Sequence, residues 1–382
     1  MGVDLFWFLP TGGDGRYLAS PVGGRDANFG YIKQVAQAVD ELGFVGVLLP
    51  TGRFCEDAWI FASSLVAVTQ RMKFIVALRP SLTQPALAAR FASTFDRVSN
   101  GRLVLNVVTG GSKFDAAADG VFLDHDLRYD QTDEFLTIFR RLVSGDQNVT
   151  FDGEHFHIQG GMLAFPTLQK PYPPLYFGGS SDAGHRTAAK HADVYLMWGE
   201  PLNQIAEQIA SVRRYAEEQE RTLRYGLRIH VIVRETEQEA WDAANNLIRY
   251  ISDDTIETAQ TLLATTDSVG QHRMTQLHGG KRDKLVIAPN LWAGIGLVRT
   301  GAGTALVGDP DQVAARLLEY ADLGIDTFIL SGYPHLEEAH RTAELLFPRL
   351  PLNKHDNTDI RFEPVPGYEF SAAAMADFAR KR

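Results

Sequence analysis

Short apolar runs alternate along most of the chain with longer amphipathic stretches. The runs are rich in β-branched and aromatic residues, which is typical of buried strands, whereas the longer stretches space their apolar residues as a helix does. Strands are predicted at about residues 5–9, 45–49, 73–78, 102–108, 175–177, 193–197, 225–233 and 327–330. Helices are predicted at about residues 31–42, 58–69, 85–98, 129–144, 183–191, 202–220, 237–250, 311–323 and 336–346.

This alternation predicts a parallel sheet, and eight strand-then-helix units predict closure into a (β/α)8 barrel with insertions, of the kind known as a TIM barrel. A doubly wound open sheet is the alternative. It is disfavoured because the Gly-rich turn at residues 11–15 lacks the G-x-G-x-x-G pattern, and no acidic residue ends the second strand.

Residues 1–350 are therefore expected to form one barrel domain with two departures from the repeat. Residues 148–166 resemble a β-hairpin outside the main pattern, and residues 252–307 form a long insertion with no clean strand signal. Because the insertion leaves the barrel next to the seventh strand, we expect it to act as a mobile lid. The segment 351–382 carries several prolines and is expected to be a tail over the surface.

The seventh predicted strand contains two residues that are unusual in an apolar run. Arg228 and His230 are two apart, so the period of a strand places both on one face. Burying a guanidinium and an imidazole costs several kcal/mol unless partners meet them. A structural ion pair or a satisfied core histidine is the simpler interpretation of such a pair in isolation.

Other polar and aromatic residues also fall where predicted strands end, which is where barrel enzymes carry their chemistry. They are Cys55, Asn106, Thr109, Ser180, Ser181, Trp198 and Tyr333, with Arg299 near the end of the insertion. This accumulation predicts a site at one rim. Arginines and a histidine suit an anionic, oxygen-rich group, unless carboxylates pair with them. Gly178–Ser181 opening a helix suits a phosphate, although a simple helix cap has the same sequence.

Composition narrows the partners. A net charge of −10 argues against nucleic acid or an anionic membrane as a partner. The single cysteine excludes an internal disulfide, and no apolar run is long enough for a membrane helix. With no leader-like stretch, we expect a cytoplasmic protein. No metal site is predicted, because no carboxylate ends a strand beside His230. Ser-His-Asp chemistry is not predicted either, because no G-x-S-x-G nucleophile elbow is present.

Several motifs together resemble one family across almost the whole chain, up to about residue 348. The family is that of the FMNH2-dependent alkanesulfonate monooxygenases of the bacterial luciferase-like superfamily. The motifs are residues 6–11 (FWFLPT), 50–53 (PTGR), 55–59 (CEDAW), 76–80 (VALRP), 171–181 (PYPPLYFGGSS), 230–236 (HVIVRET), 289–294 (PNLWAG) and 330–339 (LSGYPHLEEA).

The resemblance implies a two-component reaction in sulfur assimilation. An NAD(P)H-dependent FMN reductase supplies reduced FMN as a co-substrate, and with O2 a sulfonate is converted to an aldehyde and sulfite. The family also implies a homotetramer. The resemblance implies that the sulfonate and the reactive edge of the flavin are surrounded by Arg228, His230, Trp198, Tyr333 and Arg299. It also implies that Arg299 takes part in lid closure and that Cys55 lies near the flavin. Asn106, Thr109 and Tyr129 are implied around the flavin ring and ribityl chain, with Ser180 and Ser181 on its phosphate.

Two departures from the family bear on specificity. Gly12 stands where the family often has histidine, and Phe54 where a small residue precedes the cysteine. We expect Phe54 to narrow the pocket toward short sulfonates such as methanesulfonate. Three alternatives are a deazaflavin-dependent dehydrogenase on the same fold, a non-catalytic subunit and a sulfonate-binding protein. Arg228, Arg299 and Cys55 argue against the dehydrogenase, and the intact rim argues against a non-catalytic subunit.

Overall fold

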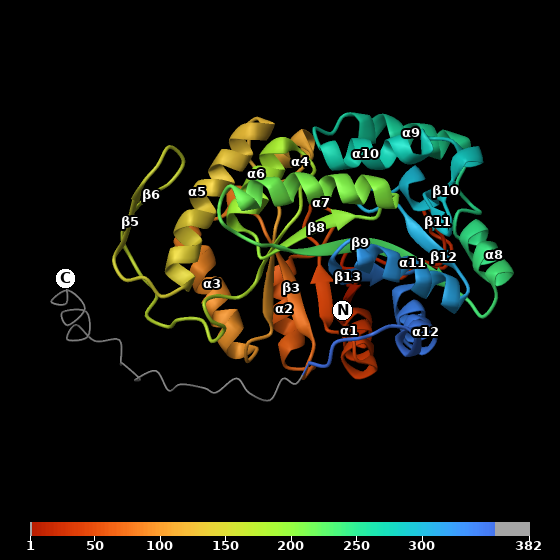
Figure 1. Cartoon of the computed structure of the whole chain (residues 1–382), viewed down its shortest axis with the longest axis horizontal. Coiled ribbons are helices and arrows are strands. Elements are labelled where there is room, and N and C mark those ends of the chain that lie inside the picture. The colour runs from red at the N-terminus through yellow and green to blue at the C-terminus, as the bar shows by residue number, and fades with distance from the viewer. Residues whose placement is uncertain (1, 356–382) are drawn as a thin grey trace.

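The computed structural model describes residues 2–355 of the 382-residue chain, and their centre is a closed barrel of parallel strands (Figure 1). β9 pairs with both β8 and β13, and β13 pairs with β1, so the ring has no open edge. The predicted (β/α)8 barrel is confirmed. Its strands are β1 (Asp4–Phe8), β2 (Gly46–Leu49), β3 (Lys73–Leu78), β4 (Leu103–Val107), β7 (Leu175–Phe177), β8 (Val194–Trp198), β9 (Arg224–Val233) and β13 (Ile325–Ser331).

Helices lie around the barrel, and most match the predicted amphipathic stretches. They are α1 (Phe29–Leu42), α2 (Ala58–Val66), α3 (Pro85–Val98), α5 (His125–Val143), α6 (Asp182–His191), α7 (Leu202–Glu217), α8 (Glu237–Leu247), α11 (Pro310–Asp322) and α12 (His335–Leu346). One further helix, α4 (Lys113–Ala118), was not predicted, because six residues are too few to display a helical period. Short 3-10 turns occur at Pro80–Leu82, Arg282–Lys284, Gly294–Leu297 and Phe347–Arg349.

The strand period separates two layers of the core. Residues such as Phe6, Ile75 and Ile329 form one buried cluster inside the barrel. Their neighbours along the strands, such as Leu5 and Trp7, belong to a second cluster that packs against the helices. Phe8, two residues after Phe6, continues the inward face of β1 and packs against the inner cluster at its upper end. The barrel interior is therefore filled up to the level of Phe8, and the polar residues lie above it.

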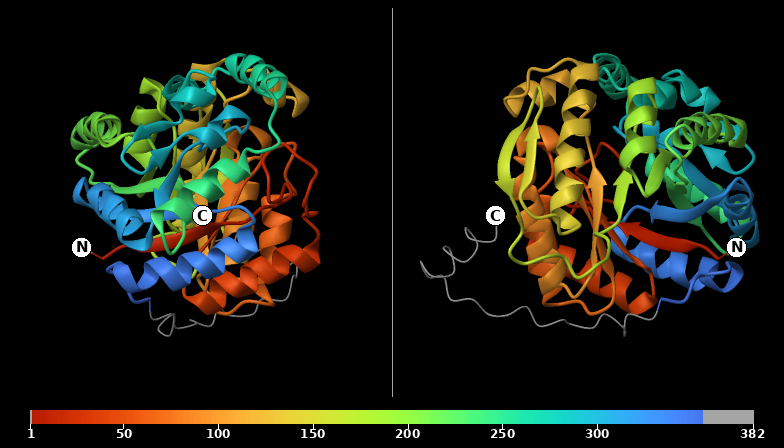
Figure 2. Two further views of the ribbon diagram at one scale, coloured as in Figure 1. Left: turned by 90° about the vertical axis from the view of Figure 1, so that its right-hand side faces the viewer. Right: turned by 60° about the vertical axis from the view of Figure 1, so that its left-hand side comes forward.

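The excursion after α5 is a separate two-stranded sheet. β5 (Val149–Asp152) and β6 (His157–Gly161) pair antiparallel with each other and with no barrel strand. Figures 1 and 2 show this hairpin outside the barrel, beside α5.

The insertion between α8 and α11 is more ordered than its sequence suggested. It contains α9 (Asp253–Ala264), α10 (Val269–His278), β10 (Val286–Ala288), β11 (Leu291–Trp292) and β12 (Ala305–Gly308). Its sequence has no clean strand signal, yet the structure has strands there: β12 pairs parallel with the end of β9, and β11 and β10 continue that sheet. Strands of two to four residues are too short to show an alternating pattern. α9 and α10 lie together at one end of the molecule (Figures 1 and 2).

The first residues of the predicted tail run beside the start of β1. The amide of Val3 donates to the carbonyl of Pro351 at 2.8 Å, and the amide of Asn353 donates to the carbonyl of Val3 at 3.1 Å. Residues 356–382 of that tail lie outside the described part of the chain. Among residues 2–355, no helix is long and apolar enough to cross a membrane.

Candidate functional site

Arg228 and His230 lie on one side of β9 and meet at a single hydroxyl. The guanidinium Nη2 of Arg228 donates to Oγ of Ser331 at 2.9 Å, and the same Oγ lies 2.6 Å from Nδ1 of His230. The register makes this contact possible, because Ser331 on β13 pairs directly with His230 on β9. The alternate residues of this strand, Leu227 and Ile229, pack in the outer core.

The charge of Arg228 has no carboxylate partner. The residue is 5% exposed, and its Nη1 donates only to the carbonyls of Ile229 (3.1 Å) and Ile329 (3.4 Å). Its guanidinium lies over the ring of Phe8 at 4.7 Å, and that of Arg299 lies over the same ring at 5.4 Å. Burial, together with the neighbouring charge of Arg299, lowers the pKa of Arg228 to about 9.

Arg299 is likewise unpaired by any acidic group. Its Nη1 donates to the carbonyls of Thr300 at 3.0 Å and Ala302 at 3.4 Å. Neither Arg299 nor Arg228 forms an ion pair with any residue in the described range 2–355. Two guanidiniums on one aromatic ring without a counter-charge repel each other, and an anion placed between them would relieve that repulsion.

His230 is neutral. Burial, with the charges of Arg228 and Arg299, holds its pKa well below the ordinary value for a histidine. Its Nε2 lies 3.1 Å from the carbonyl oxygen of Ala302, which can only accept, so Nε2 carries the proton. The ring of Tyr333 stacks on the imidazole, with centroids 5.5 Å apart and an angle of 17°.

Cys55 lies close enough to Arg299 for the two to interact electrostatically. Burial raises the pKa of its thiol, and the charge of Arg299 only partly opposes this. The loop that carries Cys55 approaches Gly12 closely: a Cβ there would lie 2.5 Å from the carbonyl oxygen of Phe54. A histidine at position 12 would therefore require the loop to move.

Phe54 does not narrow the site as the sequence suggested. Its side chain is 80% exposed and lies under the guanidinium of Arg53, at 5.2 Å. It is absent from the lining of the large cavity described next.

A cavity of about 400 Å³ opens beside the arginine pair, within the range of small-molecule sites. The remaining predicted residues line it: Asn106, Thr109, Tyr129, Ser180, Ser181 and Trp198. Cys55, Arg228, His230, Arg299 and Tyr333 do not. The two groups adjoin at Gly301, where a Cβ would lie 3.7 Å from Nη1 of Arg299 and 3.9 Å from the ring of Trp198.

This cavity has the features of a site for a phosphate-bearing aromatic ligand. Ser181 caps α6 by accepting from the amide of Gly184 at 3.1 Å, so the first turn of this helix opens on the cavity. A Cβ on Gly179 would lie 2.9 Å from the hydroxyl of Tyr129, so backbone and ring approach closely. From the insertion, Gly270 of α10 closes the other side, where a Cβ would lie 3.3 Å from Trp198 and 3.4 Å from Oγ of Ser180.

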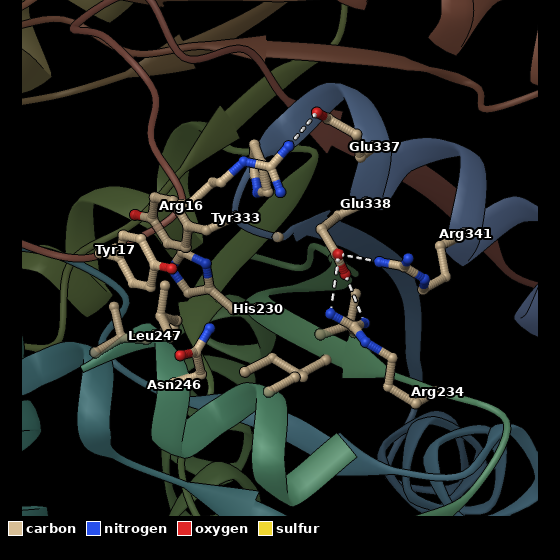
Figure 3. A pocket seen from close by; sticks show the side chains of 16 residues that line it. Arg16, Tyr17, His230, Arg234, Asn246, Leu247, Tyr333, Glu337, Glu338 and Arg341 are labelled. Atoms are coloured by element: carbon tan, nitrogen blue, oxygen red, sulfur yellow. Dashed lines mark hydrogen bonds and ion pairs between the residues drawn. The ribbon is translucent and has the colours of Figure 1, made fainter. Parts of the chain in front are cut away.

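A second cavity, of about 260 Å³, is lined in part by His230 and Tyr333 (Figure 3). It too contains arginines, but these have acidic partners from α12. Arg234 reaches Glu338 at 3.0 Å, and Arg341 pairs with the same carboxylate. Arg16 lies 3.7 Å from Glu337. The charges of this cavity are therefore largely satisfied by one another.

Sequence reasoning assigned no contact to three residues that the structure places at the site, although Ser331 and His335 belong to the rim loop after the eighth predicted strand. Phe8 carries both guanidiniums, Ser331 joins Arg228 to His230, and His335 lies beside Tyr333 with its Nδ1 2.8 Å from Oδ1 of Asp14. Ser331 directly follows the eighth predicted strand, and this position at the rim is the signal that points to it. Within residues 2–355 no group of three or more His, Cys, Asp or Glu side chains is arranged to hold a metal ion.

Comparisons with known proteins agree with this geometry. A model of the family described as luciferase-like monooxygenase matches residues 3–327. The fold resembles that of a long-chain alkane monooxygenase, with 21% identity, 93% of each chain covered and a TM-score of 0.77. It also resembles EDTA monooxygenase from Chelativorans sp. BNC1, with 18% identity, 92% of this chain and 96% of that chain covered and a TM-score of 0.73. An F420-dependent secondary alcohol dehydrogenase is similar at 17% identity, 91% and 99% coverage and a TM-score of 0.67.

Proposed function

The chain belongs to the luciferase-like monooxygenase family, and from that premise we propose that it is a flavin-dependent monooxygenase acting on alkanesulfonates. Reduced FMN and O2 are the co-substrates, and the products are an aldehyde and sulfite. The observation that carries the proposal is the pair of guanidiniums, Arg228 and Arg299, over Phe8 with no carboxylate partner in the described chain.

A sulfonate suits this pair because it is a permanent anion with three acceptor oxygens. Guanidiniums bind such oxygens through several N–H donors, and charge-assisted hydrogen bonds of this kind are roughly twice as strong as neutral ones. The apolar ring of Phe8 beneath the pair favours a ligand whose charged end continues into a hydrocarbon chain. A carboxylate or phosphate ester meets the same charges, and the substrate panel below distinguishes these.

In this proposal FMN binds in the adjoining cavity. Ser180 and Ser181 at the start of α6 would hold the phosphate, and Asn106, Thr109 and Tyr129 would line the ring and ribityl chain. When bound, reduced FMN supplies the electrons and the activation of O2 that no side chain here could supply. Structural relatives include both flavin monooxygenases and an F420-dependent dehydrogenase, so fold alone does not choose between these reactions.

The protein's own part is to bind, orient and exclude water. Arg228 and Arg299 fix the sulfonate oxygens, and Trp198, which borders both groups of residues, directs the substrate toward the flavin cavity. The insertion covers the cavity through Gly270 and Gly301, so closing it removes bulk water from the reacting groups. Cys55 and Tyr333 complete the wall near the arginines.

Sulfite release tests the proposal. The full chain, an NAD(P)H-dependent FMN reductase, air and a panel of sulfonates from methane- to decanesulfonate would be combined, with matched carboxylates and phosphate esters as controls. We expect sulfite only when reduced FMN and O2 are both present. The profile along the panel separates short-chain preference from broad specificity. No sulfite from any member, or hydride transfer from a substrate to an oxidised deazaflavin without O2, would contradict the proposal.

A further inference from the structure

Ser331 links the side chains of Arg228 and His230 on β9. The residue is fully buried at the end of β13. Its Oγ is 2.9 Å from Nη2 of Arg228 and 2.6 Å from Nδ1 of His230. Among residues 2–355, Arg228 has no other side-chain acceptor, because its remaining hydrogen bonds go to backbone carbonyls.

The direction of each hydrogen bond follows from chemistry. A guanidinium only donates, so Oγ of Ser331 accepts from Arg228. The carbonyl of Ala302 only accepts, so the neutral imidazole donates to it from Nε2. Nδ1 then has a lone pair, and the one hydroxyl proton of Ser331 is left to donate to it. Each donor in the chain from Arg228 through Ser331 and His230 to Ala302 thus has one acceptor.

This chain connects the barrel wall to the loop that carries Arg299. Ala302 lies three residues after Arg299, whose Nη1 donates to the same carbonyl at 3.4 Å. Fixing the imidazole therefore also fixes the acceptor shared with Arg299. We propose that Ser331 is a positioning residue, which holds His230 in the Nε2–H tautomer and orients Arg228 and, through Ala302, Arg299 for the anionic substrate.

The inference rests on the proposed function for its effect on turnover, but its structural core is testable without flavin or substrate. Ser331→Ala removes the donor to Nδ1 and the acceptor of Nη2 together. Ser331→Thr keeps the hydroxyl, and Ser331→Cys keeps a weaker donor of similar size. Thr304→Val is the matched control. Its buried hydroxyl donates to the carbonyl of Gly199 at 2.7 Å, and its hydrogen bond with His230 runs from the amide of that residue to the backbone carbonyl of Thr304 at 3.0 Å, which the substitution keeps.

The first readout is the ¹⁵N NMR spectrum of histidine-labelled protein, with His230→Gln used to assign the His230 signals. We expect the folded protein to show a protonated Nε2 and a hydrogen-bonded, unprotonated Nδ1. In Ser331→Ala the Nδ1 signal should move toward the chemical shift of an unprotonated nitrogen without a hydrogen bond, or show a mixture of the two tautomers. Thr304→Val should leave this signal unchanged. A His230 spectrum that is the same in Ser331→Ala and the parent would overturn the proposal.

The second readout is the pH profile of sulfite release. In Ser331→Ala we expect kcat/KM to fall about 10²-fold, the scale of a misplaced binding group. Its alkaline limb should shift to lower pH, because the charged guanidinium has lost an acceptor. Ser331→Thr should restore both, and Ser331→Cys should lie between. An unshifted profile in a folded Ser331→Ala would contradict the inference, while an inactive parent with the expected NMR spectrum would count only against the proposed function.

Discussion

Two groups of arginines lie near His230 and differ in how their charges are balanced. In the cavity of Figure 3, Arg234 and Arg341 share the buried carboxylate of Glu338, and Arg16 lies near Glu337. At the barrel mouth, Arg228 and Arg299 share only the ring of Phe8. The difference teaches that the number of arginines does not identify an anion site. Uncompensated charge in a buried position does, because folding has left it without a partner.

The largest expected effect comes from exchanging a single arginine in each group for methionine. Arg228→Met should reduce kcat/KM for sulfonates by about 10²- to 10³-fold, the scale of losing a buried charge-assisted contact. It should leave the free energy of unfolding unchanged or raised, since an unpaired buried charge is removed. Urea titration with activity assays on the same samples measures both.

Arg234→Met is the reciprocal control. It should leave sulfonate turnover close to the parent value, but lower the free energy of unfolding by roughly 1–3 kcal/mol, because Glu338 loses one of its partners in a buried position. If the two variants behaved alike, whether in activity or in stability, the contrast between the paired and the unpaired arginines would be wrong.

The next test introduces an acidic partner for Arg299 at the barrel mouth. Cys55→Asp places a carboxylate near Arg299, with which Cys55 already interacts electrostatically. We expect the Kd for a sulfonate to rise about 10- to 100-fold, since the new charge competes with the ligand and repels it. Cys55→Asn has the same size without the charge and should change Kd much less. Equal effects of Asp and Asn would show that shape, not charge, matters there.

A smaller effect should appear in the pH dependence of binding. The pKa of Arg228 is lowered to about 9, so its guanidinium loses its charge as the pH rises through that value. Sulfonate affinity should therefore be constant below pH 8 and decline above about pH 9. Arg299→Gln removes the second cause of the shift and should move the decline upward. Calorimetric titrations between pH 7 and 10 would show this, and an affinity independent of pH in the parent would count against it.

The smallest effect concerns stability in acid. The folded pKa of His230 lies well below 6.5, whereas the unfolded chain takes up a proton there near pH 6.5. The unfolded state thus binds more protons as the pH falls below about 6.5, and unfolding becomes easier by up to about 1.4 kcal/mol per pH unit. His230→Gln should flatten this part of the stability profile relative to the parent. Identical slopes in the two proteins would mean that His230 is protonated when folded.

Much of this architecture could be predicted from the sequence, for identifiable reasons. The barrel strands are apolar runs between amphipathic helices, so periodicity locates them. The rule that barrel chemistry lies at strand ends brought Arg228, His230 and Ser180 into one region. The insertion was harder, because its strands are stabilised by tertiary contacts rather than by local pattern. The strand around Leu306 pairs with β9, the strand around Trp292 pairs with the strand around Leu306, and Trp292 packs in a separate small core.

The details of the site depend on contacts that no pattern encodes. The link through Ser331 follows from the register of β13 against β9, which a sequence does not state. The outward position of Phe54 follows from the close approach of its loop to Gly12. Whether an arginine has a carboxylate partner depends on residues such as Glu338, 104 positions from Arg234. The roles of the flavin and sulfonate residues remain predictions for the experiments above.

The most direct measurement of the central claim is sulfonate binding to the protein with reduced FMN under anaerobic conditions, where no turnover can occur. Calorimetry would compare the parent, Arg228→Met and Arg234→Met with the sulfonate that the panel shows to be best. We predict saturable binding in the parent and in Arg234→Met, and a Kd at least about 10²-fold higher in Arg228→Met. Undiminished binding in Arg228→Met would contradict the assignment of the unpaired arginines as the sulfonate site.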